Sequence, residues 1–278
     1  IDGNPGVKDP RGMYGEKLGV NMHVITASAG ALRNMTACIN RCHLDIESRV
    51  VAPYAAGLSC LVEDEKELGV ICIDMGGGTT DLSVFFDGEI VYTDSVPLGG
   101  NHVTNDIARG LSTPVSYAER MKTLYGSAVP SPSDDQEVIK VPLVGEEDDG
   151  ENQISRSMLV GIIRPRIEEI YELVREKLEP TGFEKAGARR VVLTGGASQL
   201  TGVRELGAEM LDKQVRLGRP NYVKGLAESV NGPAFSAPAG LIQVILKERN
   251  ASAMTSSRTI AVSGGKFGRF GQWIKENI

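Results

Sequence analysis

The segment from Val70 to Phe86 constrains the fold of this chain more than any other. It consists of an apolar run that leads into Asp74, a turn-forming stretch with three consecutive glycines and two threonines, and a second apolar run from Leu82 to Phe86. Two apolar runs separated by a short glycine-rich stretch predict two strands joined by a tight turn.

The same turn has the composition of an anion-binding loop. Glycine lets the backbone approach a ligand closely, successive N–H groups in such a turn suit an anion, and threonine hydroxyls add donors. Asp74 ends its strand where a carboxylate could hold the water shell of Mg²⁺. An ordinary hairpin with a glycine-rich tip is the alternative, but the aspartates on both sides and the paired threonines favour phosphate binding. The candidate residues are Asp74, Gly76, Gly77, Gly78, Thr79 and Thr80, with Asp74 bound to Mg²⁺ through water.

Composition excludes several classes of protein. The chain has 278 residues and a net charge of −6, which argues against a general nucleic-acid surface because such a surface is basic. No stretch is long and apolar enough to span a membrane, and no signal peptide is recognisable. The sequence begins at Ile1 in what reads as folded sequence, so we expect an additional N-terminal part in the natural protein.

The four cysteines do not form a metal-binding pattern. Cys38 and Cys42 stand four residues apart beside His43, but no further ligands follow at the spacing of a zinc site. We expect Cys38, Cys42, Cys60 and Cys72 to be reduced, buried thiols of a cytosolic protein.

Strands and helices alternate along the chain, which is typical of an α/β fold. Before the central hairpin we expect strands at 20–26 and 44–51 and helices from Ser28, as N-cap, to Arg41 and from Pro53 to Leu61. After it we expect strands at 90–96, 138–144, 189–194 and 215–217, and helices at 103–110, 116–124, 154–178, 201–211 and 239–246. Pro165 should kink or restart the longest helix, and 145–150 reads as an exposed acidic loop.

Two further glycine pairs follow strands. Gly99 and Gly100 lie between a strand and a helix, and helix N-termini attract anions. The segment Gly195-Gly196-Ala197-Ser198 also leads from a strand to a helix, which places it where ligands bind at the carboxyl end of a sheet.

The C-terminal segment is amphipathic and follows a polar stretch, 250–263, that reads as a flexible linker. Its aromatic and aliphatic residues share one helical face, and its cations flank that face; the candidate membrane-binding residues are Lys266, Phe267, Arg269, Phe270, Trp273, Ile274, Lys275 and Ile278. A last helix docked on the core is the alternative, but the linker and the clustering of aromatics with cations favour a membrane-surface helix.

These motifs resemble those of the actin-like ATPase superfamily. The segment 74–81 resembles its second phosphate loop, 194–198 its adenosine motif, and 97–100 with Thr104 and Asp106 its connecting segment. The segment 118–122, with 126–128 after it, resembles the nucleotide-facing helix of bacterial actins, where the Glu meets the ribose and the Lys lies beside the adenine. By this resemblance Glu119, Lys122, Gly99, Gly100, Gly195, Gly196 and Ala197 join the nucleotide site.

Within the superfamily the chain is similar to the FtsA family of bacterial cell-division proteins. The similarity rests on 15–26, 63–69, 191–197 and the tethered amphipathic tail. It implies an actin-like (ribonuclease H-like) α/β fold with two lobes, an inserted subdomain and a C-terminal amphipathic helix. It also implies binding of ATP and Mg²⁺, polymerisation, and tethering of the FtsZ ring to the cytoplasmic face of the inner membrane at the division site. The implied partners are FtsZ, further copies of itself, later division proteins and anionic lipids, with no nucleic acid.

The resemblance also implies a domain layout. Residues 1–46 would be the second half of the inserted subdomain, and the first lobe would contribute the segments 47–68 and 231–249. The core of the second lobe would comprise 69–102 and 189–230, and its peripheral subdomain would comprise 103–188. The linker 250–263 and the membrane helix 264–278 would follow. One departure is that the first phosphate loop of the superfamily, an Asp-x-Gly-Ser segment, does not occur in this sequence. Half of the ATP cleft would therefore come from outside this chain.

These motifs do not by themselves distinguish the FtsA-type function from other functions of the superfamily. A sugar kinase or phosphatase would need a catalytic carboxylate and a second-substrate pocket, and no residue marks either. A chaperone ATPase would continue into a substrate domain rather than a basic aromatic helix. No catalytic residue is assigned, and because no clear base accompanies Asp74 we expect at most a slow ATPase.

Overall fold

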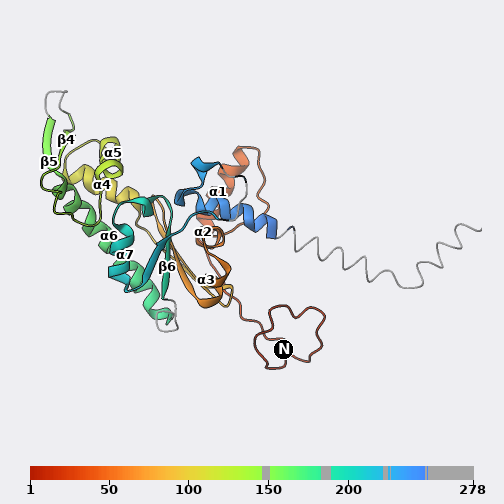
Figure 1. The fold of residues 1–278 in the computed structure, drawn as a ribbon. Coiled ribbons are helices and arrows are strands. Elements are labelled where there is room, and N and C mark those ends of the chain that lie inside the picture. The colour runs from red at the N-terminus through yellow and green to blue at the C-terminus, as the bar shows by residue number, and fades with distance from the viewer. Residues whose placement is uncertain (146–150, 183–188, 222–224, 226, 248, 250–278) are drawn as a thin grey trace, which may run out of the picture. The chain divides into compact units, whose positions relative to one another are not determined.

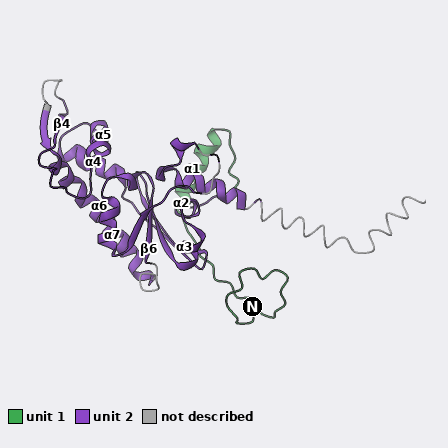
Figure 2. Ribbon diagram, in the orientation of Figure 1, with its two compact units in different colours: residues 1–48 green, residues 49–278 purple. Residues whose placement is uncertain are grey.

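The computed structural model (Figure 1) describes residues 1–145, 151–182, 189–221, 225, 227–247 and 249. The chain divides into two compact units, residues 1–48 and residues 49–278, which Figure 2 shows in different colours. The linker 250–263 and the predicted membrane helix 264–278 lie outside the described residues. Among the described helices, none combines the length and the apolar character needed to cross a bilayer.

The first unit consists of turns followed by one helix, α1 (Ala29–Arg41). This confirms the predicted helix, and the Ser28 Oγ accepts a hydrogen bond from the Ala31 N–H as an N-cap. The predicted strands at 20–26 and 44–51 are wrong, because neither segment is a strand in the structure. A strand requires a neighbour for its N–H and C=O groups, and neither segment pairs with another in the part of the chain that the structure describes.

The second unit is built on a five-stranded sheet in the order β3-β2-β1-β6-β7. Strands β1 (Val70–Met75), β2 (Thr80–Phe86) and β3 (Glu89–Val96) form an antiparallel meander, which confirms the predicted hairpin and its third strand. Strands β6 (Arg190–Thr194) and β7 (Gln214–Leu217) extend the sheet in parallel with β1. The register places Asp74 opposite Asp81 on one side and Thr194 on the other.

Both faces of the sheet are buried at the central strand β1, where side chains alternate between two cores. Ile71, Ile73 and Met75 belong to the larger core, which also includes buried side chains of α6 (Arg156–Leu178) and α7 (Val203–Leu211). Val70 and Cys72 point to the opposite face, where they pack with Phe85 and the end of α2 (Ala52–Cys60).

The peripheral part of this unit contains α4 (Gly100–Gly110), α5 (Val115–Tyr125) and a two-stranded sheet of β4 (Val138–Pro142) and β5 (Glu151–Ser155). The helix predicted to begin at Ile154 begins instead at Arg156, because the residues before it pair with β4. That helix continues through Pro165 without a restart. Most of the predicted acidic loop, 146–150, lies outside the described residues.

The remaining elements are helices and turns that precede, connect or follow the strands and helices already described. They are α3 (Glu63–Leu68), a helix over 236–247, and four 3₁₀ turns, η1 (Glu179–Thr181), η2 (Gly196–Gln199), η3 (Glu228–Val230) and η4 (Pro233–Phe235). Cys60 and Cys72 are buried, as predicted, whereas Cys38 and Cys42 are exposed on and beside α1, so the prediction of four buried thiols is wrong for that pair. Helix α1 has no buried residue, which leaves no interior for those thiols to enter.

Candidate functional site

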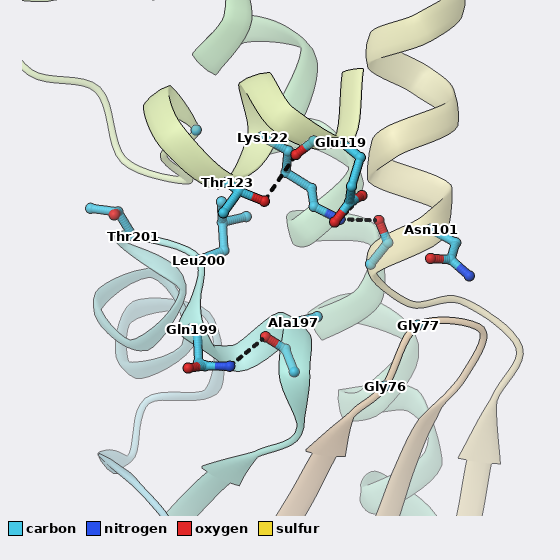
Figure 3. A pocket seen from close by; sticks show the side chains of 13 residues that line it. Gly76, Gly77, Asn101, Glu119, Lys122, Thr123, Ala197, Gln199, Leu200 and Thr201 are labelled. Atoms are coloured by element: carbon cyan, nitrogen blue, oxygen red, sulfur yellow. Dashed lines mark hydrogen bonds and ion pairs between the residues drawn. The ribbon is translucent and has the colours of Figure 1, made fainter. Parts of the chain in front are cut away.

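Three glycine-rich turns that are distant in sequence meet at one pocket. The pocket has a volume of about 400 Å³ and lies beyond the carboxyl ends of the parallel strands β1 and β6, between α5 and η2 (Figure 3). Ligands of open α/β sheets bind at such a position. The lining residues are Gly76, Gly77, Gly100, Asn101, Glu119, Lys122, Thr123, Gly126, Gly196, Ala197, Gln199, Leu200 and Thr201.

The turn between β1 and β2 borders this pocket through Gly76 and Gly77. It is closed by a hydrogen bond from the Gly76 N–H to the Thr79 carbonyl, 2.9 Å long. Among the described residues, the N–H groups of Gly77 and Gly78 have no intramolecular acceptor. Such N–H groups at a turn are suited to an anion.

The threonine hydroxyls of this turn are engaged within the protein. Thr79 Oγ1 donates to Asp81 Oδ2 over 3.2 Å, and Thr80 Oγ1 donates to the Leu98 carbonyl over 2.8 Å. The second bond ties the turn to the segment before α4. Each hydroxyl has one proton, so a ligand that approaches either oxygen meets a lone pair unless the hydroxyl rotates.

The start of α4 is bonded to the same turn. The N–H groups of Gly100 and Asn101 donate to the carbonyls of Gly76 and Gly77 over 2.9 and 2.8 Å. A Cβ at Gly99 would lie 2.6 Å from the Gly76 carbonyl oxygen, so only glycine permits this approach. The first two N–H groups of α4 therefore stabilise the β1–β2 turn and are not free to bind an anion, which differs from the expectation for this helix N-terminus.

Glu119 and Lys122 of α5 form a bonded pair at the edge of the pocket (Figure 3). The Lys122 Nζ donates to Glu119 Oε2 over 2.7 Å, to Thr104 Oγ1 over 2.8 Å and to the Gly100 carbonyl over 3.0 Å. Burial alone would raise the pKa of Glu119, but the hydrogen bonds from Lys122 and Thr104 outweigh it and lower that pKa. Glu119 is therefore an anion at neutral pH.

Asp74 lies at the end of β1 behind the turn and does not line the pocket. Burial, with a smaller contribution from the charge of Asp81, raises its pKa to about 6. A Cβ at Gly195 would lie 2.3 Å from Asp74 Oδ1, so the adenosine-type turn packs directly against this carboxylate.

The donor set near Asp74 matches a loosely held Mg²⁺ better than a protein-enclosed metal centre. Among the described residues, no three His, Cys, Asp or Glu side chains are grouped as metal ligands. Mg²⁺ often keeps most of its waters and uses one or two carboxylates beside a phosphate. Cation binding near Asp74 would favour its ionised form.

The structure brings seven of the thirteen predicted nucleotide-site residues to the pocket surface: Gly76, Gly77, Gly100, Glu119, Lys122, Gly196 and Ala197. The others, Asp74, Gly78, Thr79, Thr80, Gly99 and Gly195, belong to the turns around it but are not lining residues. Gly126 also lines the pocket and lies in the 126–128 segment noted from the sequence, although it was not assigned to the site. Sequence reasoning missed the remaining lining residues, Asn101, Thr123, Gln199, Leu200 and Thr201. Each directly follows a recognised motif, so extending the motifs by a few residues would have found them.

Comparison with known proteins identifies the family. The family model described as "Cell division protein FtsA" matches residues 71–240, and that of the "SHS2 domain inserted in FTSA" matches residues 1–26. The chain belongs to the FtsA family of cell-division proteins. The FtsA of Rhizobium meliloti (strain 1021) is 48% identical over 282 residues, which cover 100% of this chain and 64% of the relative. The FtsA of Escherichia coli (strain K12) is 34% identical over 286 residues, which cover 100% of this chain and 68% of the relative.

Solved structures confirm the actin-like ATPase fold expected for an FtsA relative. MreB5 of Spiroplasma citri bound to AMPPNP superposes with a TM-score of 0.64 at 18% identity, covering 83% of this chain and 68% of MreB5. The PilM–PilN type IV pilus biogenesis complex matches with a TM-score of 0.58 at 20% identity, covering 76% of this chain and 56% of the other. At these identities the likeness establishes the fold alone.

Proposed function

We propose that this chain forms one side of the ATP site of an actin-like cell-division protein. The observation that carries the proposal is the convergence of the turns after β1, β3 and β6 on one pocket at the carboxyl ends of parallel strands. The match to MreB5 bound to ADP and to AMPPNP supports an adenine nucleotide as the ligand, because the shared fold places the same layers around the pocket.

The lining residues suggest how such a ligand would lie. The free N–H groups of Gly77 and Gly78 would face the phosphates, the Glu119 carboxylate would accept hydrogen bonds from the sugar, and Gly196 and Ala197 would pack against the nucleoside. Asp74 would hold Mg²⁺ through water. We propose that further contacts come from the part of the protein that FtsA relatives have and this chain, at 64% of the R. meliloti protein, does not cover.

Membership of the FtsA family supports the rest of the proposal. The protein would polymerise, tether the FtsZ ring to the cytoplasmic face of the inner membrane at the division site, and help to recruit later division proteins. The domain layout set out from the sequence is part of this proposal, with residues 1–46 in the inserted subdomain and 264–278 on anionic lipids.

The test is ATP·Mg²⁺ affinity of the full-length protein, measured by isothermal titration calorimetry. Gly196 lines the pocket and has no atom closer than 3.8 Å to an added Cβ, so Gly196→Val should fold while its side chain fills space that the ligand needs. We expect at least about a tenfold loss of affinity, equivalent to about 1.4 kcal/mol.

Gly161→Leu is the matched control. Gly161 lies exposed on α6 with open space around it, so this change adds a comparable apolar group away from the pocket. Equal ATP affinity in the wild type, Gly196→Val and Gly161→Leu would overturn the assignment of this pocket. Absence of ATP binding by the wild type would overturn the proposed function itself.

A further inference from the structure

The hydroxyl of Thr104 is the centre of a small hydrogen-bond network beneath the pocket. Thr104 lies on α4 with 3% of its surface exposed. Its Oγ1 accepts from Lys122 Nζ over 2.8 Å and donates its single proton to Glu119 Oε2 at 2.5 Å, the nearer of two acceptors, since the Gly100 carbonyl lies 3.1 Å away. We propose that Thr104 is a positioning residue that fixes the Glu119 carboxylate for recognition of the sugar hydroxyls of a nucleotide. This inference rests on the proposed function.

The hydrogen bonds of the network show which groups are still able to bond a ligand, beginning with Lys122. An ammonium has three protons and no acceptor, and the three acceptors around Lys122 Nζ are Glu119 Oε2, Thr104 Oγ1 and the Gly100 carbonyl. All three Lys122 protons are therefore used within the protein. Lys122 contributes its position and its charge, and not a donor, to the pocket.

One oxygen of Glu119 remains available. Oε2 accepts from both Lys122 and Thr104, whereas Oε1 has no hydrogen bond among the described residues. The side chain is 51% exposed and lines the pocket, so Oε1 is accessible to a ligand. An ionised carboxylate accepts and does not donate, which suits the vicinal hydroxyls of a ribose and gives no advantage to a sugar that lacks them.

Thr104 determines whether that oxygen has a fixed direction. A glutamate that is half exposed samples several rotamers unless hydrogen bonds hold it, and ordering it on binding costs affinity. The hydroxyl of Thr104, which is itself buried, donates to Oε2 and restrains the carboxylate. Without it, Lys122 loses one acceptor and Glu119 loses one charge-assisted hydrogen bond, so the ribose-directed oxygen is no longer pre-positioned.

The network meets the phosphate-side turn at a single peptide, that of Gly100. The Gly100 peptide donates its N–H to the Gly76 carbonyl and accepts from Lys122 at its own carbonyl. The Thr104 hydroxyl lies 3.1 Å from that same carbonyl, whereas the bonds that hold the β1–β2 turn itself are made by backbone N–H groups. Loss of that hydroxyl should therefore weaken the contact to the sugar and leave the contacts to the triphosphate group in place.

The experiment compares the affinities of full-length protein variants for ATP, 2′-deoxy-ATP and 3′-deoxy-ATP with Mg²⁺. We expect the wild type to bind at least one deoxynucleotide about tenfold more weakly than ATP, because it lacks a hydrogen bond to a charged group. Thr104→Val should weaken ATP by about tenfold and leave the discriminated deoxynucleotide nearly unchanged, so that the selectivity ratio approaches one. Thr104→Ser keeps the hydroxyl and should keep the ratio.

Thr113→Val is the matched control. Thr113 is also buried, at 2% exposure, and its Oγ1 donates to the Pro142 carbonyl over 2.7 Å, away from the pocket. Its removal should lower stability as a buried hydroxyl does and leave the selectivity ratio at the wild-type value. Thermal unfolding of each variant identifies any that do not fold, and Glu119→Gln gives an independent route to the same loss of selectivity.

The outcomes separate this inference from the proposed function. A wild type that binds ATP but does not discriminate against either deoxynucleotide would overturn the role of Glu119 and Thr104 and leave the nucleotide site intact. An unchanged ratio in folded Thr104→Val, or a ratio that Thr104→Ser and Thr113→Val lose equally, would also overturn it. A wild type that binds none of the three nucleotides would instead contradict the proposed function.

Discussion

Gly195 lies so close to Asp74 that a methyl group in place of its hydrogen would come within 2.3 Å of Asp74 Oδ1. It would also lie 2.4 Å from the Met75 carbonyl oxygen, and the Gly195 φ of +86° is one that other residues rarely adopt. The turn after β6 is therefore pressed against the end of β1, where the two parallel strands lead to the pocket.

We expect Gly195→Ala to lower the free energy of unfolding by about 2–4 kcal/mol, from backbone strain and from overpacking against Asp74. Urea denaturation measures the change. Gly182→Ala is the control for strain alone, because Gly182 has a φ of +70° and no atom within 4 Å of an added Cβ. If both variants lose the same stability, close packing at Gly195 contributes nothing.

The raised pKa of Asp74 predicts a pH-dependent stability. Because burial moves the pKa from 3.8 to about 6 in the folded protein, folding favours the protonated form. The contribution of Asp74 to stability is complete below pH 4 and is lost as the pH rises through about 6, a change of up to about 3 kcal/mol for a shift of about two units.

Asp74→Asn should remove this dependence and be the more stable protein at pH 7.5. Denaturation midpoints between pH 4 and 7.5 test it, with Asp135→Asn, on an exposed aspartate, as the control. A wild type and an Asp74→Asn variant with parallel stability profiles would show that Asp74 has the same protonation in the folded and unfolded chains.

An ion pair with one buried partner joins β7 to α3, the helix before β1. Arg216 donates to Glu65 from Nε over 2.7 Å and from Nη2 over 2.5 Å, and Glu65 is 5% exposed. Burial alone would raise the pKa of Glu65, but the hydrogen bonds from Arg216 and the Val62 N–H outweigh it and lower that pKa. The pair therefore stabilises the protein above the ordinary pKa of 4.5, and this stability is lost as the pH falls further.

Arg216→Ala should lower the free energy of unfolding at pH 7.5 by about 1–3 kcal/mol, less than for a fully enclosed pair because the Arg216 side chain is 39% exposed. Arg204→Ala removes the partner of Glu205 from a pair that is exposed on both sides and should change stability by less than about 0.5 kcal/mol. Similar losses in the two variants, or a loss from Arg216→Ala that does not become smaller as the pH falls below 4.5, would contradict the role of the ion pair.

The sequence was sufficient to predict the centre of the fold because its signals there are local. Apolar runs separated by glycines identified β1, β2 and β6, and the turns after them proved to surround one pocket. The strands at 20–26 and 44–51 were predicted from their local sequence, by alternation in the first case, and local sequence does not reveal whether a partner strand exists. Strand β5 was missed for the opposite reason: its residues are mainly polar, and its pairing with β4 is what makes it a strand.

The roles of individual side chains in the site depended on distances that no pattern contains. Spacing placed Glu119 and Lys122 on one face of a helix, but not the third partner, Thr104, fifteen residues before Glu119. Likewise, a helix N-terminus after a glycine pair predicts an anion site, whereas the Gly100 and Asn101 N–H groups are used by the β1–β2 turn. Such competition between protein and ligand for the same donors becomes visible only in three dimensions.

The C-terminal tail remains a prediction, since 264–278 lies outside the described residues. If it folds as a helix on a bilayer, each buried aromatic or aliphatic side chain contributes at most about 1.5–3 kcal/mol, and ordering the helix opposes part of this gain. Each cation adds about 1 kcal/mol near an anionic leaflet. Gly268 and Gly271 weaken the isolated helix, so we expect a tail that folds on lipid and binds reversibly, and more strongly when filaments present many tails.

Flotation of the full-length protein with anionic liposomes tests this prediction. The wild type should float, whereas Trp273→Glu and a form truncated after Ser263 should remain with the soluble fraction, because the first places a charge on the apolar face and the second lacks the helix. Raising the salt concentration should weaken flotation of the wild type, since the contribution of Lys266, Arg269 and Lys275 is screened. If all three proteins float equally, the tail is not the anchor and the alternative of a helix docked on the core is favoured.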